Sequence, residues 1–195
     1  MTRDDILTAA AQIFSQKGFH ATSMADIAEA VHLQKASLYH HISSKQELLV
    51  EMLDTALDLL IQRMEGVMAE ALPPDRKLRQ AMIAYLNVMI ENRELAAVLL
   101  LEHRSLEPEF LARHTPRRDR FERLWRDLIQ QGLDAEVFCC MDPVISARAL
   151  LGVMNWTITW YKPGGPLTAD LLAGQFADLF LNGLLKRPEQ SGGGL

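Results

Sequence analysis

The chain has 195 residues, of which 49% are apolar and 23% charged, and its formal net charge is −5. This length and apolar content allow a small domain and a larger one, each with a packed core. The acidic balance argues against a protein that coats nucleic acid over its whole surface, because such proteins carry a basic excess. A small local DNA-binding face remains possible, since DNA affinity depends on the few Lys and Arg side chains that touch phosphate.

The chain's two cysteines, Cys139 and Cys140, are adjacent. Neighbouring cysteines rarely pair with each other because the disulfide is strained, and free thiols are typical of the reducing cytoplasm. The first residues lack the cationic and apolar pattern of a signal peptide. The longest apolar run, 144–160, is interrupted by Arg148 and Asn155 and falls short of the ~20 residues of a membrane helix. We therefore expect a cytoplasmic protein without membrane association.

Apolar residues recur at helical spacing nearly everywhere, and strand alternation is absent. We predict an all-α fold of about nine helices. The first ends at Gly18, and the others span 24–31, 35–41, 45–71, 75–91, 93–106, 108–132, 142–161 and 168–185. Pro116 is expected to split the seventh helix near its start. We place a helix-turn-helix domain at residues 1–46, a larger helical domain at 47–187 and a disordered tail at 188–195.

The first three predicted helices have the spacing of a helix-turn-helix, with a tight turn at residues 32–34 before the third. In this motif the third helix enters the major groove. Its polar side chains suit that role, because Lys and Tyr can hold phosphate while Gln and Ser can reach base edges. Leu38 and Ile42 are expected to anchor the helix to its core.

Residues 22–30, 35–41 and 44–49 together resemble the DNA-binding domain of the TetR family, with caps, turn and helices in one register. The resemblance implies phosphate or base contacts from the third helix and phosphate-facing side chains at helix starts, where the helix dipole favours an anion. The candidate DNA-binding residues are Thr22, Ser23, Gln34, Lys35, Ser37, Tyr39, His40 and Lys45. His32 stands where the family commonly has a turn glycine, and we expect it to adopt the left-handed conformation.

In the larger domain, residues 101–110 and 155–167 are similar to a TetR subgroup that regulates fatty-acid or sterol catabolism and responds to acyl-coenzyme A (acyl-CoA) thioesters. The resemblance implies such an effector. Six arginines crowd residues 113–126, and Arg forks match phosphate oxygens. The candidate ligand-binding residues are Leu100, His103, Arg104, Arg117, Arg120, Phe121, Trp125, Leu128, Met154, Asn155 and Thr159. The alternatives are a solvated face of ion pairs for the arginines and core packing for the aromatic residues.

The last two predicted helices suggest a homodimer. Residues 144–160 are apolar almost all round, which predicts burial on several sides, and the final helix carries a wide apolar stripe. A helix-turn-helix protein usually binds paired half-sites as a dimer. The candidate interface residues are Leu151, Trp156, Leu172, Phe176 and Phe180. The alternative is that both stripes face their own domain.

The patterns and the family resemblance together predict a dimeric repressor on a palindromic DNA operator, and the resemblance implies release by a small-molecule effector, an acyl-CoA thioester. The alternatives are a TetR-type sensor of hydrophobic or aromatic compounds and a non-catalytic helical scaffold. An enzyme is not expected, because Ser37 near His40 and His41 lacks an orienting carboxylate. Neither a cofactor nor a metal is expected, since there is no Gly-rich phosphate loop and Cys139 and Cys140 with His114 do not have zinc spacing.

Overall fold

A computed structural model describes residues 2–139 and 142–184, and the predicted tail at 188–195 lies outside this part of the chain. Nine α-helices and one 3-10 turn make up the regular helical structure of these residues, which confirms the all-α prediction. The elements are α1 (Arg3–Lys17), α2 (Met24–Ala30), α3 (Lys35–His41), α4 (Lys45–Ala69), α5 (Pro74–Glu91), α6 (Arg93–Leu101), η1 (His103–Ser105), α7 (Pro108–Asp134), α8 (Pro143–Trp160) and α9 (Ala169–Leu184).

Local capping explains where several helices begin. Thr2 and Ser23 form capping boxes with Asp5 and Asp26 at the starts of α1 and α2, and Ser44 accepts a hydrogen bond from the Glu47 backbone at the start of α4. Each cap satisfies backbone N–H groups that have no partner within the helix. These short-range signals are the reason the predicted N-terminal bounds of α2 and α4 match those of the structure.

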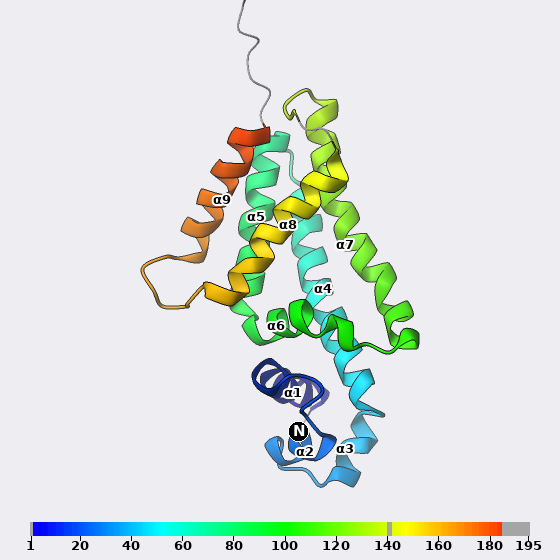
Figure 1. The fold of residues 1–195 in the computed structure, drawn as a ribbon. Coiled ribbons are helices and arrows are strands. Elements are labelled where there is room, and N and C mark those ends of the chain that lie inside the picture. The colour runs from blue at the N-terminus through cyan, green and yellow to red at the C-terminus, as the bar shows by residue number, and fades with distance from the viewer. Residues whose placement is uncertain (1, 140–141, 185–195) are drawn as a thin grey trace, which may run out of the picture.

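Two hydrophobic cores share the long helix α4 (Figure 1). The N-terminal core joins α1, α2 and α3 to the first part of α4, including Leu49 and Leu53. The larger core joins the rest of α4, from Leu57 to Val67, with α5, α7, α8 and α9. Because one continuous helix belongs to both cores, a displacement of α4 in the larger domain moves the N-terminal helices with it.

Helix α6 crosses between the two cores (Figure 1). Its Val98 is fully buried in the N-terminal core, which also holds Leu106 just after η1. The sequence predicts one helix over 93–106, but α6 ends at Leu101 and the short η1 follows. The Gln46 amide donates to the Ser105 carbonyl at 2.9 Å, so a tertiary contact occupies the backbone at this break.

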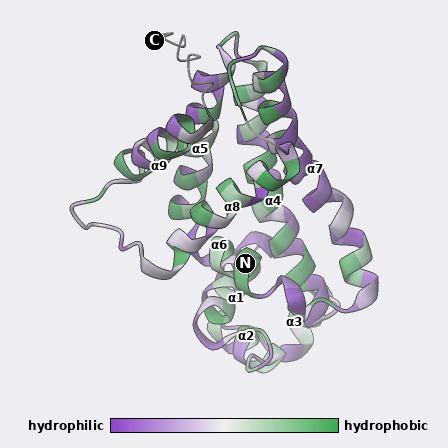
Figure 2. Ribbon diagram, turned by 45° about the horizontal axis from the view of Figure 1, so that its top comes forward, coloured by the Kyte–Doolittle hydropathy of each residue, from purple (hydrophilic) through white to green (hydrophobic). Residues whose placement is uncertain are grey.

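The expected split at Pro116 is wrong, because α7 runs unbroken through it. Proline removes one helical N–H bond, here to the carbonyl of Ala112, and Ala112 is exposed, so water can satisfy that carbonyl. On both sides of Pro116, His114 and Arg117 bond to α4, which holds the two segments in line. In Figure 2 much of α7 is hydrophilic, consistent with a helix that packs along one side only.

Candidate DNA-binding face and ligand cavity

Helices α2 and α3 are joined by a turn in which His32 has φ +53°. This confirms the left-handed conformation expected where the family commonly has glycine. Leu38 is the fully buried residue of α3, and Ile42 just beyond the helix is buried as well. The rest of α3 is therefore presented at the surface, at the end of the molecule away from α9 (Figure 1).

Several predicted DNA-binding residues lie together on this surface. Gln34, Lys35 and His40 are exposed, Ser37 is half-buried, and Tyr39 is 46% exposed. A large aromatic side chain held this far into solvent by a short helix gains little from core packing. The geometry therefore places cationic and hydrogen-bonding groups on one accessible face.

Three predicted residues at helix starts are bonded within the protein. Thr22 is 2% exposed, and its hydroxyl donates to the Gly18 carbonyl at 2.8 Å. The Lys45 ammonium donates to the carbonyls of Phe19 and Thr22 at 2.8 Å each, so it fastens α4 to the loop after α1. The exposed Ser23 hydroxyl donates to Asp26, and the Ser23 backbone N–H holds the pKa of that carboxyl below its ordinary value. The Thr22 hydroxyl and Lys45 ammonium thus serve the domain's own structure.

A cavity of about 350 Å³ lies in the larger domain, between α4, α5, α6, α7 and α8. Its walls are mixed, with apolar side chains and a few polar groups, as is usual for small-molecule sites. Four predicted ligand-binding residues line it, namely Leu100, His103, Phe121 and Asn155. Further lining residues are Leu57, Leu60, Tyr85, Leu99, His114, Arg118, Glu122, Arg148, Leu151 and Gly152.

Polar groups of the cavity lie both inside it and at its edge. The Tyr85 hydroxyl donates to the Asn155 side-chain oxygen, and burial raises the pKa of Tyr85 above its ordinary value. Burial also lowers the pKa of His103, so its ring is neutral at pH 7. Arg118 and Arg148 keep 50% and 69% of their side chains exposed, which places cationic groups where the cavity meets solvent.

The other predicted ligand-binding residues lie elsewhere. Trp125, Leu128 and Met154 are at most 1% exposed in the larger core, which agrees with the core-packing alternative. The exposed Thr159 donates its hydroxyl to the Trp156 carbonyl, and Arg104 is exposed on η1, outside the cavity lining. Periodicity alone could not separate these positions, because a core wall and a cavity wall have the same apolar pattern.

The arginines of α7 divide into two groups. Arg113, Arg117 and Arg120 form ion pairs with carboxylates of α4. They follow the ion-pair alternative, although their partners lie on another helix and not within α7. Arg118 pairs with Asp119 within α7 and also lines the cavity, a position that the sequence did not distinguish from its neighbours. Sequence reasoning also missed Tyr85 and His114, whose signal is a polar side chain on a buried helix face.

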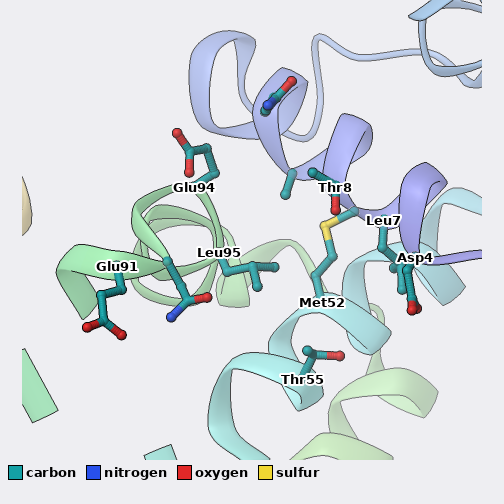
Figure 3. Close-up of a pocket in the computed structure, with 11 residues that line it drawn as sticks. Asp4, Leu7, Thr8, Met52, Thr55, Glu91, Glu94 and Leu95 are labelled. Atoms are coloured by element: carbon teal, nitrogen blue, oxygen red, sulfur yellow. The ribbon is translucent and has the colours of Figure 1, made fainter. Parts of the chain in front are cut away.

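A second cavity of about 280 Å³ lies where α1 meets α4 and the junction of α5 and α6 (Figure 3). Leu7, Met52 and Leu95 form an apolar side, and the acidic residues Glu91 and Glu94 stand on the α5–α6 side. Leu95 also packs against the N-terminal core, so the cavity lies beside the contact through which α6 joins the two domains.

The predicted interface residues differ in their surroundings. Trp156 is 65% exposed on α8, whereas Leu172 is 3% exposed and packs in its own core. Leu151 is half-buried on the cavity wall, and Phe176 and Phe180 are partly buried against the larger core. Large apolar side chains that remain exposed on α8 and α9 are Ile145, Val153, Trp156, Trp160, Leu171 and Leu179.

A surface helix follows a tight turn, and a shared long helix joins it to a helical domain with a cavity open to solvent. This arrangement defines a helix-turn-helix regulator. Comparisons with known proteins lead to the same class of protein. Residues 6–52 match the family model "Bacterial regulatory proteins, tetR family", and residues 71–184 match "Tetracyclin repressor-like, C-terminal domain". The chain belongs to the TetR family.

Individual relatives match along nearly the whole chain. The HTH-type transcriptional repressor KstR2 of Mycolicibacterium smegmatis is 31% identical over 186 residues, 93% of this chain and 90% of KstR2. The crystal structure of the regulator PfmR from Thermus thermophilus has a TM-score of 0.84 at 37% identity, covering 91% of this chain and 97% of PfmR. AibR in complex with isovaleryl coenzyme A and operator DNA has a TM-score of 0.82 at 29% identity, covering 94% and 97% of the two chains. Within residues 2–139 and 142–184, no helix has both the length and the apolarity to span a membrane.

Proposed function

We propose that this protein is a dimeric transcriptional repressor in the cytoplasm, released from its operator when an acyl-CoA thioester enters the cavity of the larger domain. The observation that carries the proposal is the position of α4. Leu49 and Leu53 of this helix pack in the DNA-binding domain, while Leu57 and Leu60, one and two turns further on, line the cavity. A ligand that favours another position of α4 therefore changes the relative position of the two DNA-binding domains in the dimer.

The shape and charge of the cavity support a thioester with a compact acyl group. A space of about 350 Å³ is near the lower limit for small-molecule sites and holds an acyl group, but not the whole coenzyme. Arg118 and Arg148 stand at the solvent edge, where the phosphates of the coenzyme would emerge. AibR, which shares this fold at 29% identity, is known in complex with isovaleryl coenzyme A.

The surface of α8 and α9 supports a homodimer. Trp156 is 65% and Leu179 is 66% exposed, and such apolar side chains in a soluble protein mark interaction sites when they gather on one surface. Dimerisation through these helices leaves both α3 helices free to meet successive half-sites, roughly 34–36 Å apart, on DNA.

A second candidate effector is a neutral aromatic compound. Tyr85 and Phe121, which both line the cavity, are stacked with ring centroids 6.0 Å apart. A flat ring could pack against such a pair. An aromatic compound needs no phosphate contact. Replacing Arg118 and Arg148 should therefore weaken binding of the thioester and leave binding of the aromatic compound unchanged.

The test measures operator binding by fluorescence anisotropy, with a DNA duplex selected from random sequence by the purified protein. We expect isovaleryl-CoA or a bulkier acyl-CoA to release the DNA, and free coenzyme A to act far more weakly. The double variant Arg118→Gln/Arg148→Gln should weaken thioester binding about tenfold or more, the scale of a lost charge-assisted hydrogen bond. Arg123→Gln, an arginine of α7 outside the cavity lining, is the matched control. Release by aromatic compounds alone would replace the thioester with the second candidate.

A further inference from the structure

His114 is a buried polar residue on the wall of the cavity. It is 2% exposed, lies on α7 and lines the cavity beside Phe121. Its Nδ1–H donates to the Asp54 carboxylate of α4, with 2.7 Å between Nδ1 and Oδ1. The other carboxylate oxygen of Asp54 accepts from the Arg117 guanidinium at 2.7 Å. Asp54 is thereby held from two directions by α7.

The bond belongs to a series of polar links between α4 and α7. Arg113 pairs with Glu47, Arg117 pairs with Asp58 as well as Asp54, and Arg120 pairs with Glu65. These arginines keep 38–60% of their side chains exposed, so water and salt weaken their pairs. His114 differs from them because it is buried and lines the cavity.

The second ring nitrogen of His114 has no hydrogen-bond partner among the described residues. With its Nδ1 proton bonded to Asp54, the ring has Nε2 left for a further hydrogen bond. His114 lines the cavity, so a ligand bound there can reach this ring. A ligand with a hydroxyl or an amide, which can both donate and accept, can therefore complete the bonding of this ring.

We propose that His114 couples the cavity to α4: its Nε2 contacts the bound effector, and its Nδ1 transmits the displacement to Asp54. The proposal rests on the proposed function, since it adds to that function the residue that links ligand binding to DNA release. An imidazole that shifts toward the ligand draws the Asp54 carboxylate with it, because a 2.7 Å hydrogen bond does not stretch freely. His114 is thus a positioning residue for α4.

The test uses a larger side chain, in place of a ligand, to fill the cavity. A side chain at Gly152 meets open space on the cavity wall, so Gly152→Phe is tolerated locally. Leu100→Trp fills the cavity from α6 and avoids α8 and its exposed apolar surface. Gly66→Phe places the same ring on an exposed, open site of α4 and is the matched control. Operator affinity is measured by anisotropy for each variant, and the oligomeric state by sedimentation.

In an otherwise unchanged protein, we expect both filling variants to weaken operator binding at least fivefold, the lower end of ordinary allosteric coupling, and Gly66→Phe to leave it unchanged. His114→Gln removes the Nδ1 donor, and in this background we expect the same variants to weaken binding by much less than fivefold, because the link to α4 is lost. Glu65→Gln, which removes an exposed pair of the same series, should keep the fivefold effect. The deciding quantity is the ratio of operator affinities without and with a filling substitution. If His114 had a merely structural role, His114→Gln would lower the melting temperature and leave this ratio unchanged.

Three outcomes would overturn the proposal: an undiminished ratio in His114→Gln, an equal loss in Glu65→Gln, or no effect of either filling variant in the unchanged protein. If Gly152→Phe alters dimerisation, Leu100→Trp alone decides. The result is independent of effector identity. If acyl-CoA thioesters fail to release DNA while the filling variants behave as expected, the proposed effector falls and His114 coupling stands. If a thioester releases DNA equally from His114→Gln and unchanged protein, the proposed effector stands and the coupling through His114 falls.

Discussion

The Lys45 ammonium lies 4.2 Å from the centroid of the Phe19 ring and donates to the Phe19 carbonyl at 2.8 Å. This contact ties the first turn of α4 to the loop between α1 and α2. Replacing Lys45 by Met keeps the apolar stem and removes the ammonium donor from the carbonyls of Phe19 and Thr22. We expect the free energy of unfolding in urea to fall by ~1–3 kcal/mol, the scale of hydrogen bonds to a charged group and of a cation–π contact. Lys35→Met, at an exposed site on α3, should change it by less than ~0.5 kcal/mol. Equal stability of the two variants would contradict the bonding described for Lys45.

The exposed face of α3 predicts how operator affinity depends on salt. If Lys35 contacts a phosphate, Lys35→Ala weakens binding to all DNA sequences and reduces the slope of log K against log salt by about 1. Tyr39→Phe removes only a hydroxyl and should weaken binding without changing that slope, because no charge is lost. Anisotropy titrations between low and moderate salt give both values. An unchanged slope in Lys35→Ala would remove Lys35 from the DNA contact.

Two glycines in helices should respond to alanine with opposite signs. A Cβ at Gly132 would overlap the ring of Phe138, which is 3% exposed and folds back so that its backbone N–H donates to the Gly132 carbonyl at 2.9 Å. Overpacking of this kind costs ~1–3 kcal/mol or more. Gly66 is exposed with open space around it, so Gly66→Ala should raise stability by ~0.5–1 kcal/mol. Urea unfolding of both variants checks the pair, and a stable Gly132→Ala protein would contradict the packing of Phe138.

Acidification should lower the unfolding free energy of the protein through His103. Burial lowers the pKa of this ring below its ordinary 6.5, so the unfolded chain binds the proton more readily than the folded protein. Stability is therefore unaffected by His103 above about pH 6.5 and decreases as the pH falls from there toward the lowered folded pKa. The difference in unfolding free energy between unchanged protein and His103→Gln, measured about one pH unit above and one below that ordinary pKa, isolates this residue. We expect the variant to lose less stability on acidification, and an equal loss in both proteins would contradict the prediction.

The exposed apolar surface predicts the effect of charge on assembly. Trp156→Arg with Leu179→Arg places two cations on side chains that are largely exposed in the single chain, so its fold is retained. We expect sedimentation at micromolar concentration to give a monomer, and operator affinity to fall sharply because the half-sites are no longer bound together. Tyr39→Ala is the control, since it should weaken operator binding and remain a dimer. A dimer that persists in the double variant would place the interface elsewhere.

Most of the secondary structure was predictable because its signals are local. The caps at Ser23 and Ser44, the stripe of apolar residues in each helix and the turn at His32 act within a few residues of one another. The helix-turn-helix, with Lys35, Tyr39 and His40 exposed on α3, was found for the same reason.

The candidate sites were predictable only where a residue's surroundings follow from its own helix. Arg117 and Arg118 are neighbours in sequence, yet Arg117 pairs with Asp54 and Asp58 of α4, whereas Arg118 pairs with Asp119 of its own helix and lines the cavity. Likewise, Lys45 stands at a helix start that the family resemblance assigned to phosphate, but it is bonded to the carbonyl of Phe19. These roles depend on which faces of distant helices meet, and no local pattern records that packing. Lys45 lies at the start of a helix in the sequence, but its ammonium holds the loop between α1 and α2, a contact that only the packed structure shows.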